Sequence, residues 1–188
     1  MPYLKGMSTN RSFDEINNWW LSNLKNTIEA RLKDNPDLTV LDLGCGRKAK
    51  AITMLTQIYP TIKGIGLNYK INSNVETSNR LQIVVGDLFN MPFKEVADIT
   101  YCAFVLHDIF TGIGDLRKET AEAVLKIATT LKKGGVAFVD ERIFSARKYS
   151  LDYLVDKIQE KNANFIRNYN IKANQSGIYD NYLTIEKK

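Results

Sequence analysis

Apolar residues recur every three or four positions near the start of the chain, which is the spacing of one face of a helix. They are Phe13, Ile16, Trp20, Leu24, Ile28 and Leu32. Ser12 precedes this stripe and Glu15 follows three residues later, the pattern of a capping box. Pro36 ends the helix, because a residue that precedes proline is pushed out of the α region. The pattern predicts an N-terminal helix, and we expect residues 1–33 to form a helical cap.

After Pro36, short apolar runs alternate with amphipathic stretches. The runs predict strands at residues 39–43, 61–67, 81–85, 97–105, 136–140, 165–171 and 178–185. The stretches between them predict helices at 49–59, 69–78, 116–131 and from 151 onward, with a glycine turn at 133–135. This alternation is typical of a doubly wound α/β sheet. We expect one domain, residues 34–188, with a mostly parallel seven-stranded sheet that ends in an antiparallel hairpin.

Composition narrows the class of protein. Of the 188 residues, 44% are hydrophobic and 25% are charged, as in ordinary globular proteins. No stretch approaches the ~20 apolar residues of a membrane span, and the first residues lack the apolar run of a secretory signal. Two cysteines and one histidine can build neither a disulfide framework nor, by themselves, a zinc site. We therefore expect a cytoplasmic protein without a metal centre.

Basic residues are concentrated in one part of the sequence. The formal net charge is +5, and the only acid between positions 47 and 80 is Glu76. The basic residues there are Arg47, Lys48, Lys50, Lys63, Lys70 and Arg80. Such a segment can attract nucleic acid or an acidic ligand, and it can equally be a solvated surface. RNA is therefore kept as an alternative partner.

The first predicted strand leads directly into a glycine-containing turn. Gly44 and Gly46 follow the strand and let the backbone approach a ligand at its carboxyl end, where open α/β sheets bind cofactors. Asp42 lies two residues before Gly44 and is expected to be buried. A buried carboxylate is costly without partners, so this combination favours a ligand that carries a cation or several donors.

Three further motifs follow at the ends of later predicted elements. Gly86, Asp87 and Leu88 come after the third strand, where an acid can accept a hydrogen bond from an exocyclic amine such as that of adenine. Residues 105–108 follow the fourth strand, and residues 131–135 precede the fifth. Each motif alone also occurs as an ordinary turn. The order and spacing of all four are more specific than any one of them.

In this order, the motifs resemble those of the class I S-adenosylmethionine-dependent methyltransferases, over roughly residues 36–188. The resemblance implies a Rossmann-like sheet with a reversed last strand and S-adenosyl-L-methionine as cofactor. It implies that the glycine turn lies against the methionine part, with Asp42 near the ammonium group, and that Asp87 binds the adenine amine. The implied cofactor-binding residues are Asp42, Gly44, Cys45, Gly46, Gly66, Asn68, Asp87, Leu88, Cys102 and Ala103.

Two positions depart from the family pattern. Lys48 stands where the family has a third glycine, and Gly66 stands where an acid usually binds the ribose. Asn68 is the expected neutral substitute, although a lost charge-assisted hydrogen bond costs ~1.5–3 kcal/mol. The departures leave open a non-catalytic binding or scaffold protein that keeps the fold. A dinucleotide-binding fingerprint also matches residues 44–49, but the acid that it requires about twenty residues later is absent. Arg47 and Lys48 could instead accept the 2′-phosphate of NADP, an alternative that Asp42 and the later motifs disfavour.

The sequence names no catalytic residue unambiguously. His107 is the only histidine and is expected at the carboxyl edge of the sheet, where its pKa near neutrality suits a general base. The alternative is a helix-start residue bonded to backbone. Asp140 and Glu141 leave the fifth strand at the same edge. The predicted function is methyl transfer to a small molecule, with methylation of RNA as the alternative. The Asn/Asp-Pro-Pro-Tyr/Phe signature of amino methylases is absent at residues 101–104.

Overall fold

The computed structural model describes residues 24–72, 74–103, 105–106, 116–140, 151–175 and 181–188. Within these residues, seven strands form one sheet in the order β3-β2-β1-β4-β5-β7-β6. The strands are β1 (Thr39–Leu43), β2 (Lys63–Asn68), β3 (Leu81–Val85), β4 (Ala97–Ala103), β5 (Leu131–Asp140), β6 (Tyr169–Gln175) and β7 (Asn181–Lys187). The first five strands are parallel, and β7 is antiparallel to both of its neighbours. The predicted mostly parallel sheet with a reversed last strand is confirmed.

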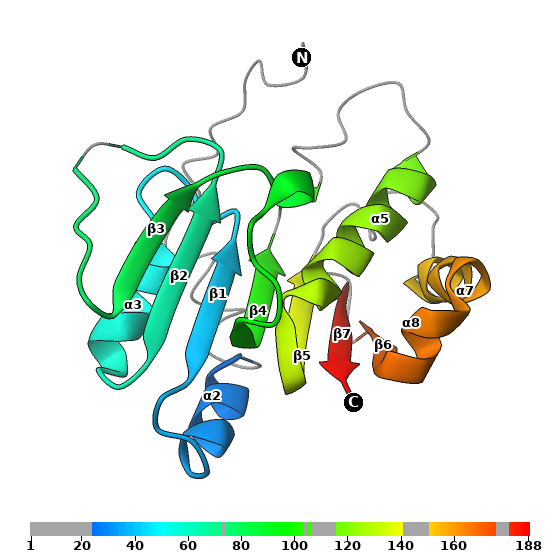
Figure 1. Cartoon of the computed structure of the whole chain (residues 1–188), viewed down its shortest axis with the longest axis horizontal. Helices are drawn as coiled ribbons and strands as arrows, with labels where there is room; N and C mark the ends of the chain where they lie inside the picture. Colours follow the sequence, from blue (N-terminus) through cyan, green and yellow to red (C-terminus); the bar gives the residue numbers. More distant parts are fainter. Residues whose placement is uncertain (1–23, 73, 104, 107–115, 141–150, 176–180) are drawn as a thin grey trace.

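Helices cover both faces of this sheet (Figure 1). They are α2 (Lys25–Leu32), α3 (Lys50–Ile58), the 3₁₀ turn η2 (Leu88–Asn90), α5 (Leu116–Thr129), α7 (Leu151–Lys161) and α8 (Ala163–Asn168). α5, α7 and α8 pack on one face, and α3 packs on the other, while α2 lies at the amino ends of the strands. None of the helices in the described part of the chain is long and apolar enough to cross a membrane.

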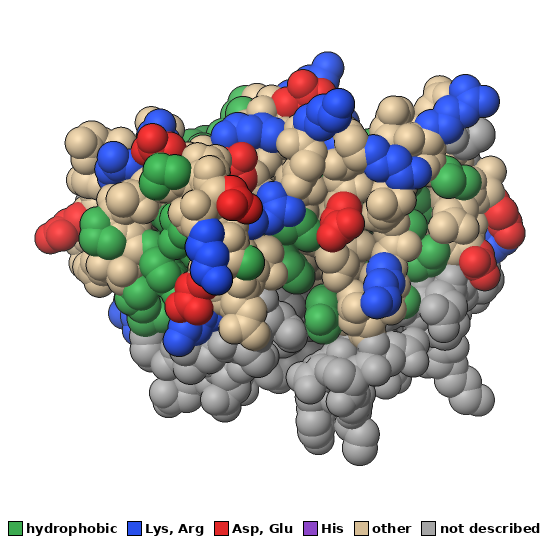
Figure 2. Space-filling model, turned by 90° about the horizontal axis from the view of Figure 1, so that it is seen from below, with side chains coloured by type: hydrophobic (Ala, Val, Ile, Leu, Met, Phe, Trp, Pro, Cys, Tyr) green, Lys and Arg blue, Asp and Glu red, His purple; other side chains and the backbone are tan. Residues whose placement is uncertain are grey.

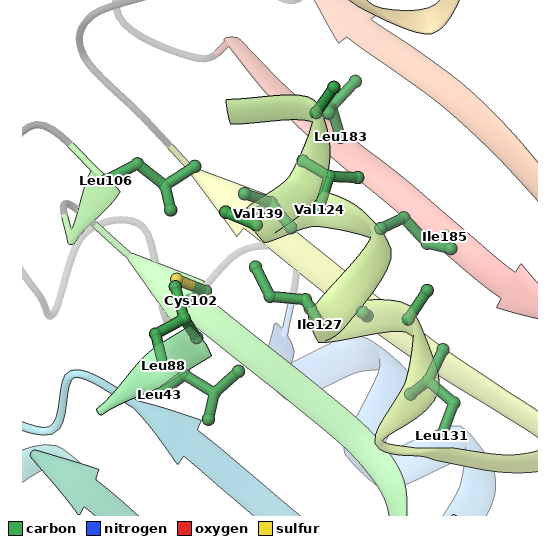
Figure 3. Packing of buried hydrophobic residues seen from close by; sticks show 14 of the residues in the cluster. Leu43, Leu88, Cys102, Leu106, Val124, Ile127, Leu131, Val139, Leu183 and Ile185 are labelled. Atoms are coloured by element: carbon green, nitrogen blue, oxygen red, sulfur yellow. The ribbon is translucent and has the colours of Figure 1, made fainter. Parts of the chain in front are cut away.

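Two apolar clusters hold the layers together. Strand side chains alternate between faces, so Leu41 and Leu43 of β1 enter one cluster and Val40 enters the other. In the first cluster, Val124 and Ile127 of α5 pack over the sheet (Figure 3). Their strand partners include Leu43, Cys102, Val139, Leu183 and Ile185. The second cluster joins α2 and α3 to the opposite face. Both faces of the central strands are therefore buried, as the continuous apolar runs of the sequence require.

The described part of the N-terminal helix follows the predicted stripe. Leu24 and Ile28 are buried, and the amides of Asp34 and Asn35 donate to the Arg31 carbonyl at 3.1 and 2.9 Å, which ends the helix before Pro36. The predicted start at Ser12 lies outside the described residues. The division into a cap, residues 1–33, and a main domain, residues 34–188, stays a prediction.

The helix predicted at residues 69–78 is wrong, because the described residues of this segment contain no helix. The Asn68 side chain donates to the Lys70 carbonyl at 2.6 Å, and the Asn72 amide donates to the Arg47 carbonyl at 2.9 Å. Asparagine side chains compete in this way with helical hydrogen bonds. The segment instead lies against the turn that follows β1.

The strand predicted at residues 165–171 begins too early. The Asn162 side chain accepts a hydrogen bond from the Phe165 amide at 3.0 Å and caps α8. Phe165 is buried and its ring stacks on that of Tyr169, with centroids 4.7 Å apart. The strand β6 therefore starts at Tyr169.

The glycine turn predicted at residues 133–135 is also wrong, because these residues belong to β5. The Thr130 hydroxyl donates to the Ile127 carbonyl at 2.7 Å, directly after α5 ends at Thr129. Between the register pairs Ala97–Leu131 and Ile99–Val136, β5 takes three more residues than β4. Gly134, with φ of +74°, sits in this bulge.

Candidate functional site

The turn between β1 and α3 contains two glycines in the left-handed region, with φ of +79° at Gly44 and +72° at Gly46. A β-carbon at Gly44 would lie 2.1 Å from Cγ2 of Val105, whereas one at Gly46 would meet no atom within 4 Å. The amides of Gly44 and Cys45 donate to the Leu67 carbonyl at 2.7 and 3.0 Å. The turn is thus tied to β2, and the backbone at Gly46 is open to a ligand.

Asp42 lies next to this turn, in the middle of the sheet. Its carboxylate side chain is buried, with 3% of the residue exposed. Its register neighbours are Gly66 on β2 and Tyr101 on β4, and Tyr101 is 2% exposed. Burial raises the pKa of the Tyr101 hydroxyl, and the charge and hydrogen bonding of Asp42 raise it further. Tyr101 therefore keeps its proton beside the Asp42 carboxylate.

Gly66 makes room for the side chain of Cys45. A β-carbon at Gly66 would lie 2.9 Å from Sγ of Cys45 and 2.9 Å from Cδ1 of Ile83. Burial and, secondarily, the charge of Asp42 raise the pKa of the Cys45 thiol well above its ordinary range. The thiol is therefore neutral and is no nucleophile. It occupies the place next to the strand position where the resemblance expects a ribose-binding acid.

The adjacent ends of β2 and β3 carry Asn68 and Asp87. The Gly86 amide donates to the Asn68 carbonyl at 3.0 Å, which brings the two strand ends together. Asp87 is exposed, and its carboxylate accepts hydrogen bonds from the Phe89 amide at 3.0 Å and from Nδ2 of Asn90 at 2.9 Å. A carboxylate has about four acceptor positions, so Asp87 could still accept from a ligand amine.

Comparison with known proteins identifies the family. A family model described as a methyltransferase domain matches residues 41–139, more than half of the chain, from within β1 to within β5. The chain belongs to the class I S-adenosylmethionine-dependent methyltransferases. No curated protein sequence is significantly similar to it.

Solved structures with the same fold are distant in sequence. The antibiotic-resistance methyltransferase Kmr is 15% identical, with a TM-score of 0.59 over 87% of this chain and 93% of Kmr. The N-methyltransferase NodS of Bradyrhizobium japonicum WM9, in complex with S-adenosyl-L-homocysteine, is 12% identical, with a TM-score of 0.57 over 98% of this chain and 93% of NodS. A 16S rRNA (adenine(1408)-N(1))-methyltransferase of Catenulisporales acidiphilia is 11% identical, with a TM-score of 0.55 over 86% of this chain and 89% of that enzyme. At such low identity, these likenesses establish the fold alone.

Two predicted residues of this methyltransferase, Cys102 and Ala103, end β4 at the same carboxyl edge as Asp42 and the glycine turn, but the Cys102 side chain faces away from Asp42. The Cys102 side chain is buried in the first cluster near Leu43 and Leu88, on the other face of the sheet from Asp42 (Figure 3). A ligand contact from Cys102 would have to come from its backbone. Leu88 is buried in the same cluster, whereas Ala103 ends β4 and is half-buried.

His107 and Glu141 lie outside the described residues, and Asp140 ends β5 in a position where only its backbone is described. The general-base role of His107 stays a prediction.

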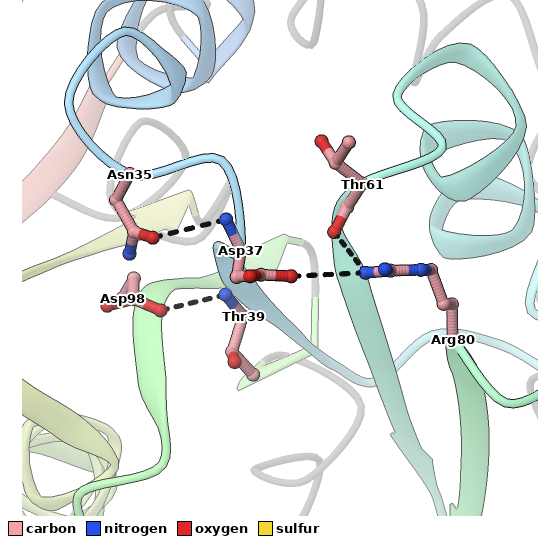
Figure 4. Close-up of polar contacts among 6 residues, drawn as sticks. All are labelled: Asn35, Asp37, Thr39, Thr61, Arg80 and Asp98. Carbon is pink, nitrogen blue, oxygen red and sulfur yellow. Dashed lines mark hydrogen bonds and ion pairs between the residues drawn. The ribbon is translucent and has the colours of Figure 1, made fainter.

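The basic segment of the methyltransferase divides between two edges of the sheet. Arg47, Lys48 and Lys50 are exposed between β1 and α3, and Lys70 is exposed just after β2. Arg80 precedes β3 at the opposite edge, where it contacts Asp37 at 3.4 Å and the Thr61 carbonyl at 2.6 Å (Figure 4). Figure 2 looks onto this opposite edge, at the amino ends of the parallel strands, and shows basic and acidic side chains mixed there. The six residues therefore do not form one patch.

The sequence interpretation missed Tyr101 as a member of the site. Asp42 is the next-to-last residue of β1 and Tyr101 the third from last of β4, which runs one residue further, so the two are register partners. Adjacent parallel strands place such residues on the same face. The alignment of the predicted strands β1 and β4 was therefore the sequence signal that could have identified Tyr101 as a site residue.

Proposed function

We propose that this methyltransferase moves the methyl group of S-adenosylmethionine to a small-molecule nucleophile. The observation that carries the proposal is the buried Asp42 beside the open backbone of Gly46, at the carboxyl end of a central strand. When bound, S-adenosylmethionine supplies a methyl group that is already activated by its sulfonium. The protein then has to align the acceptor with the methyl group and exclude water, which requires positioning more than acid–base chemistry.

The residues fit the two ends of this cofactor better than its middle. The Asp42 carboxylate suits the ammonium of the methionine part, and the open backbone at Gly46 suits its carboxylate end, because the Gly44 and Cys45 amides already donate to the Leu67 carbonyl. Asp87 suits the adenine amine. The Cys45 thiol adjoins Gly66, so the ribose is left to Asn68, a neutral partner. We therefore expect binding without the usual charge-assisted ribose contact.

The cofactor assignment is tested by calorimetry with S-adenosylhomocysteine and NADP. We expect S-adenosylhomocysteine to bind and NADP not to bind. Asp87→Asn should weaken S-adenosylhomocysteine binding by ~10–100-fold, because it replaces the charged acceptor for the adenine amine. Asparagine can still cap the Phe89 amide, so η2 is retained.

The control for this variant is Asp156→Asn, on the exposed side of α7. No response to S-adenosylhomocysteine would favour a scaffold protein.

The small-molecule acceptor is supported by the absence of the amino-methylase signature at residues 101–104. RNA is the second candidate, favoured by the exposed side chains of Arg47, Lys48 and Lys50 at the edge that carries Gly46. The likeness to a 16S rRNA methyltransferase agrees with this alternative.

Salt dependence separates the two acceptors. If RNA is the substrate, the affinity for a mixed RNA pool should fall steeply with salt, and replacing Arg47, Lys48 and Lys50 with serine should flatten the slope. Lys63→Ser is the control, because Lys63 begins β2 at the opposite edge. A lack of RNA binding at low salt leaves the small-molecule acceptor.

A further inference from the structure

A tyrosine hydroxyl is buried against the acid of the candidate cofactor site. Tyr101 and Asp42 are direct register partners on the adjacent strands β4 and β1, and neither is more than 3% exposed. Both belong to the same face of the sheet, because Tyr101 is buried in the cluster that contains Val40 and Ile99. Two polar side chains thus meet within an otherwise apolar layer.

Packing fixes the ring of Tyr101 in this position. Its register partner on the other side is Phe138 of β5, which is 6% exposed and whose ring centroid lies 6.3 Å from that of Tyr182. The row Gly66, Asp42, Tyr101, Phe138 therefore crosses four strands on one face. A phenylalanine would supply the same apolar contacts. The hydroxyl costs free energy when it is buried, unless it is hydrogen-bonded.

We propose that Tyr101 is a positioning residue, whose hydroxyl donates a hydrogen bond to the Asp42 carboxylate and holds it toward the ammonium group of the cofactor. This inference rests on the proposed function, because it requires S-adenosylmethionine to bind at the carboxyl end of β1.

The direction of this hydrogen bond follows from the protonation states. Burial and Asp42 both raise the pKa of Tyr101, so the hydroxyl keeps its proton and acts as the donor. The neighbouring Cys45 thiol is likewise neutral, because its pKa is raised by burial and by Asp42. When Asp42 is ionised, its carboxylate is then the only negative charge of the Tyr101–Asp42–Cys45 group. A hydrogen bond to an ionised carboxylate stabilises the charged form, the form that attracts an ammonium group.

The test compares two ligands that differ in the amino-acid part. S-adenosylhomocysteine has the ammonium group, and 5′-methylthioadenosine lacks the whole amino-acid part. Tyr101→Phe should weaken S-adenosylhomocysteine binding by about tenfold and leave 5′-methylthioadenosine binding unchanged, because only the first ligand uses Asp42. Tyr59→Phe is the matched control, since its hydroxyl donates to Glu29 at 3.0 Å, far along α3 from the glycine turn.

A double-mutant cycle tests whether Tyr101 acts through Asp42. In an Asp42→Asn background, Tyr101→Phe should cause no further loss of S-adenosylhomocysteine affinity. An equal loss in both backgrounds would overturn the proposal, and so would an equal weakening of both ligands, which would indicate a structural role only. If Tyr101→Phe does not fold, Asp42→Asn is measured in the otherwise wild-type chain, and an unchanged ratio of the two affinities overturns the proposal, because Tyr101 is proposed to act through Asp42.

The outcomes also separate this inference from the proposed function. If the wild-type protein binds neither ligand, the cofactor assignment fails and the role of Tyr101 fails with it. If the wild-type protein binds S-adenosylhomocysteine and Tyr101→Phe binds it equally well, the cofactor assignment stands and only the positioning role is overturned.

Discussion

At the scale of single residues, two glycines of the same turn are required for different reasons. Gly44 and Gly46 both have positive φ, which costs an alanine ~1–2 kcal/mol. Only Gly44 also faces Val105, so Gly44→Ala should lose ~1–3 kcal/mol more than Gly46→Ala in urea unfolding. Equal losses would contradict the close approach. Val105→Ala should reduce the difference, because it removes the methyl group at 2.1 Å.

The same reasoning applies to Gly66, where the family acid is missing. Gly66→Ala should destabilise the protein by ~1–3 kcal/mol, because its β-carbon would meet the Cys45 thiol and the Ile83 methyl group, each at 2.9 Å. In a Cys45→Ala background the loss should be smaller, since one of the two clashes is gone. Additive losses in urea unfolding would show that Cys45 does not fill this space.

At the scale of elements, one carboxylate joins the amino ends of three strands. Oδ2 of Asp98, which follows the first residue of β4, accepts from the Thr39 amide of β1 and from Nζ of Lys132 of β5, each at 2.8 Å (Figure 4 shows the Thr39 bond). Asp98 is largely buried, with a side chain 15% exposed, whereas that of Lys132 is 40% exposed. Losing the acceptor therefore leaves a backbone donor unsatisfied, whereas losing the lysine removes a half-exposed ion pair.

Asp98→Ala should accordingly cost ~1–3 kcal/mol, and Lys132→Ala less than ~1 kcal/mol, in thermal or urea unfolding. Asp98→Asn should fall between them, because the amide oxygen can still accept from Thr39. If Lys132→Ala were as damaging as Asp98→Ala, the ion pair rather than the Thr39 bond would hold the three strands.

The sequence predicted the element types correctly where the apolar pattern along the element was clear, as in α5 and the strands β1 to β4. It failed where a single local bond decided the outcome. Asn162 caps α8 and converts the start of a predicted strand into helix, and Thr130 ends α5 so that Gly134 lies in a bulge rather than a turn. Periodicity does not encode such contacts, because they depend on one side chain meeting one backbone group.

The residues of the candidate site also fall into those that the sequence could predict and those that it could not. Asp42 and the glycine turn could be predicted, because they follow one strand directly in sequence. Tyr101 could not be predicted as a site residue from its own segment, since its place beside Asp42 depends on the register between β4 and β1. The space taken by Cys45 beside Gly66 was likewise invisible, because it depends on side-chain packing between a turn and a neighbouring strand.

At the scale of the whole molecule, the half-buried Cys45 and the buried Tyr101 at the carboxyl edge make the free energy of unfolding depend on pH in the alkaline range. The pKa values of Cys45 and Tyr101 are both raised, chiefly by burial, above the ordinary values of 9.0 and 10.0 that apply in the unfolded chain. A group whose folded pKa is raised stabilises the protein fully below its unfolded pKa. That contribution falls as pH rises above it, because the unfolded state then releases a proton that the folded state retains.

We therefore expect the free energy of unfolding to fall above about pH 9 by up to ~1.4 kcal/mol per pH unit for each group, first through Cys45 and then through Tyr101. Urea unfolding under reducing conditions between pH 8 and pH 11 measures this slope. Cys45→Ser should flatten it from pH 9, and Tyr101→Phe from pH 10, whatever either substitution does to stability at neutral pH. Lysine and exposed tyrosine side chains titrate equally in wild type and variants, so the difference in slope isolates Cys45 and Tyr101. Parallel slopes would mean that these two groups ionise in the folded protein as readily as in water, and that the carboxyl edge around Asp42 is hydrated rather than buried.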